Sequence, residues 1–193
     1  MRKLTIAFLL LFLSMKTYSQ LNISGGLSAG YQVRDQYIFD TQGLTVSEGT
    51  YASIGYGLQL YKMFYLQNEF GFIQTGMKYK TPDYSEIFNY MHYSVFFKVK
   101  PDFSALYFSI GLYASYLTSA AKVENTTVND ITRLFLPYDY GYVPALGIKF
   151  NLGYFEIFSE ARIYYGYPSI YQQNEIKNRT AVMVLGINFL KLR

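Results

Sequence analysis

The chain has 193 residues, enough for one domain, and it contains no cysteine, which excludes disulfide bonds and thiolate metal sites. The formal net charge is +4, but Arg2, Lys3 and Lys16 belong to the first 19 residues, which contain no acid. The rest of the chain has 17 − 3 = 14 basic residues against 13 acidic residues. It is therefore nearly neutral, and we expect no nucleic-acid partner.

Residues 1–19 have the features of a cleaved signal peptide. Arg2 and Lys3 precede an uncharged run of ten residues, and Thr17 and Ser19 place small residues at positions −3 and −1 of a cut before Gln20. The apolar run is too short to cross the ~30 Å hydrocarbon core as a helical anchor. We predict that residues 1–19 are removed and that residues 20–193 form the mature domain.

Apolar and polar or small residues then alternate in eight segments. In the clearest segment, residues 106–117, Phe108, Ile110 and Leu112 alternate with Ser109 and Gly111. A period of two is typical of a β-strand, and about 9–11 residues suffice for a tilted strand to cross a bilayer. The other predicted strands are residues 21–33, 51–61, 64–80, 90–100, 140–150, 154–167 and 180–189.

Short and long connections alternate between these strands. Residues 62–63, 101–102 and 151–152 are predicted tight turns, whereas the predicted loops are residues 35–49, 81–87, 119–139 and 168–178. This order is typical of bacterial outer-membrane barrels, whose short turns are periplasmic. We predict an all-β protein, an eight-stranded antiparallel up-and-down transmembrane β-barrel in the bacterial outer membrane, with both termini periplasmic.

The apolar faces could point outward into lipid, or inward around a ligand as in lipocalins. The opposite faces are rich in Gly, Ser, Gln and Tyr and lack the density of Lys and Glu that a water-exposed surface usually carries. Tyr and Phe also gather near the strand ends, as interfacial girdles do. We therefore expect Phe108, Leu112, Ile157 and Leu185 to face hydrocarbon.

Six charged residues fall on the predicted inward faces: Glu69, Lys98, Lys149, Glu156, Glu160 and Arg162. Eight strands leave a lumen that side chains can fill, and buried charges require opposite partners. We predict a network of ion pairs and tyrosines that fills the lumen. The alternatives are a proton or ion path and a small-solute channel.

His92 is the only histidine, and Ser94 follows on the same face of the strand. Small barrels that deacylate lipid A use such a His-x-Ser pair, with His as the base for a serine nucleophile. Here the pair falls on the inward face, and the next residue is Val95 where those enzymes have Asn. We expect an interior histidine with hydrogen-bond partners and no enzyme activity, cofactor or metal site; a lipid-A-type acyl hydrolase is the alternative.

The chain resembles the PorT-like outer-membrane β-barrel proteins of Bacteroidetes-type bacteria, which are related in architecture to OmpA/OmpX barrels. The resemblance covers residues 20–189, and the segments that carry it are residues 66–76, 89–91, 107–117, 139–141 and the last strand, which ends at Phe189. The family often has Glu-x-Pro where this chain has His92 and Ser94, and residues 191–193 extend past its usual aromatic end.

The resemblance implies an envelope protein, and some members serve protein secretion. We expect outer-membrane lipid and lipopolysaccharide around the barrel. An envelope or secretion protein is the expected partner, contacted through residues 35–49 and 119–139, because loops on a rigid scaffold commonly carry function.

Overall fold

The computed structural model describes residues 18–34, 44–80, 83–124, 127–170 and 176–190. Within these ranges it contains nine β-strands and one 3-10 helix. In chain order they are β1 (Tyr18–Arg34), β2 (Leu44–Tyr61), β3 (Phe64–Lys80), β4 (Asp83–Val99), β5 (Leu106–Glu124), β6 (Thr127–Asp130), η1 (Thr132–Leu134), β7 (Tyr138–Asn151), β8 (Phe155–Ser169) and β9 (Ile176–Leu190). The described residues include no helix that is long and apolar enough to cross a membrane.

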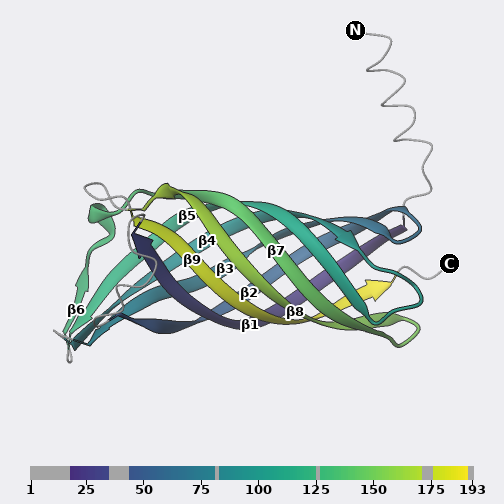
Figure 1. Cartoon of the computed structure of the whole chain (residues 1–193), viewed down its shortest axis with the longest axis horizontal. Coiled ribbons are helices and arrows are strands. Elements are labelled where there is room, and N and C mark those ends of the chain that lie inside the picture. Colours follow the sequence, from purple (N-terminus) through teal and green to yellow (C-terminus); the bar gives the residue numbers. More distant parts are fainter. Residues whose placement is uncertain (1–17, 35–43, 81–82, 125–126, 171–175, 191–193) are drawn as a thin grey trace, which may run out of the picture.

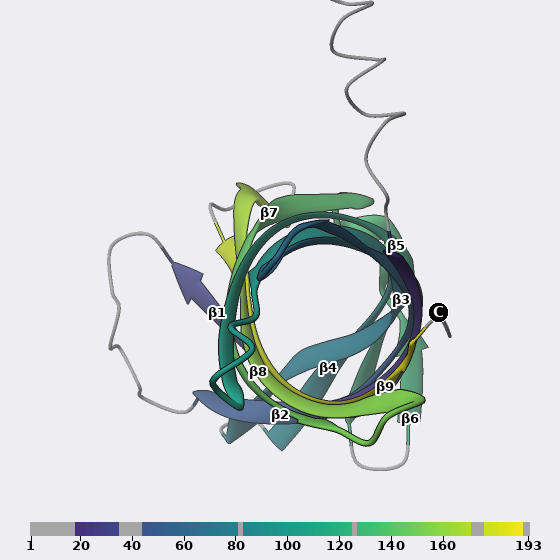
Figure 2. The same ribbon diagram turned by 90° about the vertical axis from the view of Figure 1, so that its right-hand side faces the viewer.

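All strands except β6 form one closed antiparallel ring. Its order is β4-β3-β2-β1-β9-β8-β7-β5, and the pairing of β4 with β5 closes it, as the view along the barrel shows (Figure 2). Gln20 of β1 pairs with Leu190 of β9 at the end of the barrel that carries the three short connections (Figure 1). We call this the short-connection end and the opposite one the far end. The predicted antiparallel up-and-down barrel is confirmed.

The closed ring has the predicted eight strands, but the described residues contain nine rather than eight, because an additional strand lies inside residues 119–139, the longest predicted loop. β6 pairs with residues 121–124 of β5, and the hairpin projects from the ring at the far end (Figure 1). β5 is its partner in the sheet, so β6 takes no part in the closed ring. All four side chains of β6 are exposed. They need no apolar alternation, which is the signal that marks the other strands.

Several strands also begin or end beyond their predicted limits at the far end. β2 begins at Leu44 rather than 51, β4 at Asp83 rather than 90, and β5 continues to Glu124 rather than 117. A strand of 17 residues spans about 56 Å at ~3.3 Å per residue, which exceeds the ~30 Å hydrocarbon core of a bilayer even when the strand is tilted. Outside the hydrocarbon the two faces need not differ, so the period of two fades although the backbone pairing continues.

The short connections differ slightly from their predicted limits. Residues 62–63 form the predicted tight turn, with Lys62 at φ 41°. Residues 100–105 connect β4 to β5, so that connection is longer than predicted. Residues 152–154 connect β7 to β8, and Gly153 there adopts φ 86°, a conformation that favours glycine.

The apolar faces point outward, as predicted. The exposed fractions of Phe108, Leu112, Ile157 and Leu185 are 56%, 68%, 39% and 63%. Along β5 every second residue is buried, so exposed and buried side chains alternate regularly from Leu106 to Leu117. A lipocalin-like arrangement requires the reverse orientation and is excluded.

Aromatic rings fill much of the interior, and glycines make room for them. Phe96, Tyr107 and Phe158 are buried inside the ring. A Cβ atom at Gly111 would lie 2.5 Å from Cδ1 of Phe96, and one at Gly147 would lie 2.6 Å from Oη of Tyr107. The lumen is therefore packed, and its glycines are the complement of its large rings.

This packing predicts that Gly147→Ala destabilises the barrel by about 1–3 kcal/mol, because the ring of buried Tyr107 must move. Gly57→Ala is the matched control, since a Cβ at that position meets no atom within 4 Å. Urea unfolding in phospholipid vesicles measures both. Equal effects of the two variants would contradict the packed lumen.

Candidate functional site

The centre of the lumen contains a buried arginine between two buried glutamates. The guanidinium of Arg162 (β8) donates to both carboxylate oxygens of Glu69 (β3), over 2.6 and 2.9 Å. It also donates to Oε2 of Glu160 through Nε at 2.9 Å and Nη2 at 2.6 Å. β3 and β8 lie on opposite sides of the ring, so Arg162 reaches across the lumen.

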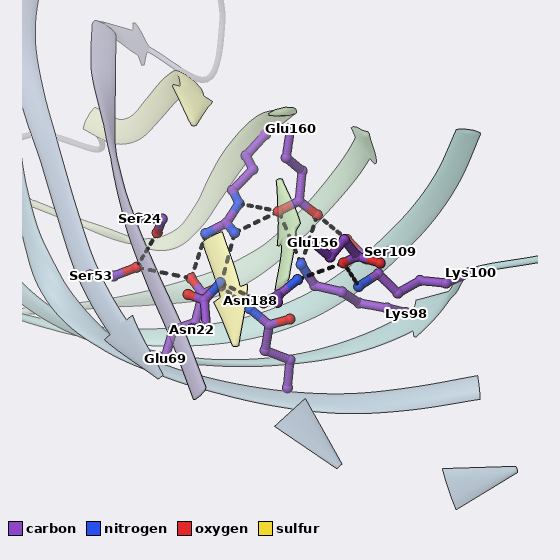
Figure 3. Close-up of polar contacts among 12 residues, drawn as sticks. Asn22, Ser24, Ser53, Glu69, Lys98, Lys100, Ser109, Glu156, Glu160 and Asn188 are labelled. Atoms are coloured by element: carbon purple, nitrogen blue, oxygen red, sulfur yellow. Dashed lines mark hydrogen bonds and ion pairs between the residues drawn. The ribbon is translucent and has the colours of Figure 1, made fainter. Parts of the chain in front are cut away.

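Neighbouring side chains complete the hydrogen bonding of both glutamates. Lys98 donates to the Glu160 carboxylate over 3.1 and 3.2 Å, and Ser109 donates to it over 2.8 Å (Figure 3). Tyr51 and Gln67 donate to Glu69 over 2.9 and 2.5 Å. We call Glu69, Lys98, Glu160 and Arg162, together with these three neutral donors, the Arg162 network.

A separate ion pair, outside the Arg162 network, lies towards the short-connection end. Lys100, directly after β4, pairs with Glu156. The amide of Asn188 donates to the same carboxylate over 2.6 Å, and Asn22 donates to Asn188 over 2.9 Å. With the Arg162 network, this gives three buried cations for three buried carboxylates, so the two clusters together are neutral.

The structure thus brings together four of the six predicted lumen charges, Glu69, Lys98, Glu160 and Arg162. Glu156 is also inside, but its partner is Lys100, which was not among the six. Lys149 is half-buried and takes part in none of the ion pairs found among the described residues. Lys100 continues the inward series His92, Ser94 and Lys98, so the alternation itself carried the signal for it.

His92 and Ser94 also lie in the lumen, both fully buried. The expected hydrogen-bond partners of the histidine are absent from the described residues, because neither ring nitrogen of His92 nor Oγ of Ser94 has one. The imidazole instead packs against the rings of Tyr51 and Tyr164, with centroid distances of 5.3 and 6.1 Å. The pair faces away from lipid, and no hydrogen bond joins the proposed base to the proposed nucleophile.

We therefore expect Ser94→Ala to leave lipid A unchanged, because its hydroxyl touches neither a base nor a lipid substrate. Mass spectrometry of lipid A from cells that express the protein or the variant measures this. The vector-only strain is the control. A loss of one acyl chain that depends on Ser94 would establish the hydrolase alternative instead.

Multi-carboxylate and histidine metal sites hold their ion with several acidic or histidine side chains gathered around it. Among the described residues, no three His, Cys, Asp or Glu side chains gather closely enough to hold a metal ion together. The polar residues of the interior are mostly engaged with one another. The Arg162 network is therefore a cross-brace between opposite walls of the barrel.

No protein-family model matches the chain, and no curated protein matches it. Solved structures do. Neisserial surface protein A is 10% identical with a TM-score of 0.54, and the match covers 88% of this chain and 96% of that protein. OprG from Pseudomonas aeruginosa is 12% identical with a TM-score of 0.51, covering 91% and 97%.

The fold is that of a small outer-membrane β-barrel. Ail, the attachment invasion locus protein of Yersinia pestis, is also similar, with 15% identity and a TM-score of 0.47 over 91% of this chain and 100% of that one. The structural similarity to Neisserial surface protein A and OprG shows the fold alone, a small barrel of the OmpA/OmpX type, and the resemblance to PorT-like proteins stays a prediction.

Proposed function

We propose that this protein resides in the bacterial outer membrane and has a non-enzymatic structural, binding or secretion-associated role, with its contacts at the far end. The observation that carries this proposal is the combination of a lipid-compatible outer surface with a braced and packed lumen. His92 and Ser94, the candidate catalytic pair, are buried in the lumen and lie away from that surface.

Outer-membrane lipid and lipopolysaccharide are the surroundings that such a surface fits. In this setting the short-connection end faces the periplasm, and with it both termini. The signal peptide belongs to the same proposal. Most of residues 1–19 lie outside the described residues; Tyr18 and Ser19 form the start of β1.

The Arg162 network supports a closed lumen rather than a small-solute channel. It joins β3, β4 and β8 across the lumen, and its ion pairs are fully buried. A path for solutes requires these pairs to separate, which is costly because each charge then lacks its partner in a low-dielectric interior. We expect a closed lumen in planar bilayers.

The projection formed by the end of β5, β6 and η1 is our candidate binding element. Val128 and Leu134 are exposed on this projection, and Leu136, in the segment between η1 and β7, is also exposed. The other predicted contact loop is residues 35–49, and residues 35–43 of it lie outside the described residues. The proposed partner is an envelope or secretion protein.

Three measurements test this proposal. Unboiled protein should migrate differently from boiled protein on a detergent gel and should give a closed trace in a planar bilayer. Affinity capture from solubilised envelopes should enrich a partner with the native chain and lose it when Val128, Leu134 and Leu136 are changed to Ser. Leu112→Ser is the control and should retain the partner. Stepwise conductance in the native chain, or capture unaffected by the triple change, would contradict the proposal.

A further inference from the structure

A third buried polar cluster surrounds Asp139, near the far end of the lumen. Asp139 is the second residue of β7, and its side chain is 2% exposed. The hydroxyl of Tyr113 donates to Oδ2 over 3.0 Å, and Nδ2 of Asn178 donates to the same oxygen over 3.1 Å. Oδ1 has no hydrogen-bond partner among the described residues. One oxygen of this buried carboxylate therefore lacks a polar partner.

No side-chain cation neutralises Asp139 within the described residues. None of the ion pairs there includes it, in contrast to the buried glutamates of the Arg162 network. The charge of Arg179 influences Asp139 only through longer-range electrostatics, without a direct ion pair. The guanidinium of Arg179 donates to the backbone oxygens of Gly166 and Asn178. A buried carboxylate without a counter-charge is costly, so the site requires a positive charge or a proton from solution.

A cavity of about 10 Å³ adjoins the carboxylate. This volume is at the lower limit for one particle the size of a water molecule. Nine side chains line the cavity, and eight of them carry an oxygen atom, the ninth being Ile73. The hydroxyl of Tyr90, which is buried, also lacks a hydrogen-bond partner, and the hydroxyls of Thr75 and Thr180 lie 3.0 Å apart. Oxygen-bearing side chains thus surround the cavity on several sides, beside the apolar surface that their rings and Ile73 contribute.

We propose that this cavity binds one alkali cation, Na⁺ or K⁺, between Oδ1 of Asp139 and the surrounding hydroxyl oxygens. Hard cations take oxygen ligands, and neither His nor Cys lines the cavity. The single carboxylate balances a single positive charge. Ca²⁺ or Mg²⁺ would leave an excess positive charge in the lumen, and their protein sites commonly use more than one carboxylate.

The site would connect β7 and β9, which contribute no residue to the Arg162 network, to strands that the network already joins. Its lining residues come from six strands, β3, β4, β5, β7, β8 and β9. A bound cation therefore ties the far half of the lumen together, as Arg162 does in the middle. The alternative occupant is a water molecule beside a protonated Asp139, which fills the same volume without bringing a charge.

Cation-dependent stability separates these occupants. The refolded mature barrel in zwitterionic phospholipid vesicles is unfolded with urea in NaCl, KCl or N-methylglucamine chloride at equal ionic strength. At a cation concentration ten times its Kd, the unfolding equilibrium constant should fall about tenfold relative to N-methylglucamine. Asp139→Asn should remove this difference. Asp130→Asn, which removes an exposed carboxylate of β6, should retain it.

Equal stability of the native chain in all three salts would overturn the proposal, as would a cation effect that persists in Asp139→Asn. Stability that follows pH and ignores the cation would assign the site to water and a proton. If Asp139→Asn fails to fold, Tyr90→Phe removes one oxygen and keeps the ring, and it should weaken the cation effect. Crystals soaked in RbCl or thallium acetate should show an anomalous peak beside Asp139; no peak at a saturating concentration would refute the site.

Discussion

Arg162→Met should destabilise the barrel by about 3–5 kcal/mol, the largest loss that we expect from a single side chain. The change removes the cation that pairs with Glu69 and Glu160, and both carboxylates are fully buried. Lys98 still neutralises Glu160, but Glu69 is left without a counter-charge in the lumen. Loss of one partner from a buried pair typically costs this much. Because the chain has no Trp, urea unfolding is followed by gel mobility of unboiled samples from vesicles.

Lys149→Met is the matched control, since it makes the same change of charge at a half-buried lysine that takes part in no described ion pair. It should cost less than ~1 kcal/mol. Adding Glu69→Gln to Arg162→Met should recover part of the lost stability, because it removes the unpaired charge. Similar losses of unfolding free energy in Arg162→Met and Lys149→Met would show that the Arg162 network does not brace the barrel.

Leu112→Arg should cost about 2–4 kcal/mol in a bilayer, because a charge on the lipid face near the membrane midplane is that unfavourable. Leu112 lies within the outward apolar series of β5 and is highly exposed. In a water-soluble protein, the same substitution at an exposed position usually changes stability by no more than ~0.5 kcal/mol. The measurement is the unfolding free energy of the refolded barrel in phospholipid vesicles.

Leu134→Arg serves as the control for this prediction. Leu134 is also exposed, but it belongs to η1 on the projection outside the ring. We expect a change within ~0.5 kcal/mol there, since the new charge remains in water. Losses of equal size at Leu112 and Leu134 would mean that the outer face of β5 does not meet hydrocarbon.

The barrel and the orientation of its side chains could be predicted from the sequence. The alternation from Leu106 to Leu117 is a local property, because successive side chains of any strand point to opposite faces. Alternation of this kind separates the two faces of each strand, and the scarcity of Lys and Glu on the polar faces then assigns Leu112 to the outside and Lys98, Glu160 and Arg162 to the inside without knowledge of strand pairing. The same local signal fails for β6, whose exposed residues have no faces to distinguish.

Which inward residues meet one another depends on strand register, and the sequence pattern does not contain it. Arg162 and Glu69 are 93 residues apart, and their contact depends on the register of every strand between β3 and β8 around the ring. Register likewise pairs Glu156 with Lys100 rather than with Lys149. It also brings Asp139, at the end of a predicted loop, into the lumen beside Tyr113 and Asn178. Alternation specifies the face of a residue but not its height along the barrel axis, and ion pairs and cavities depend on both.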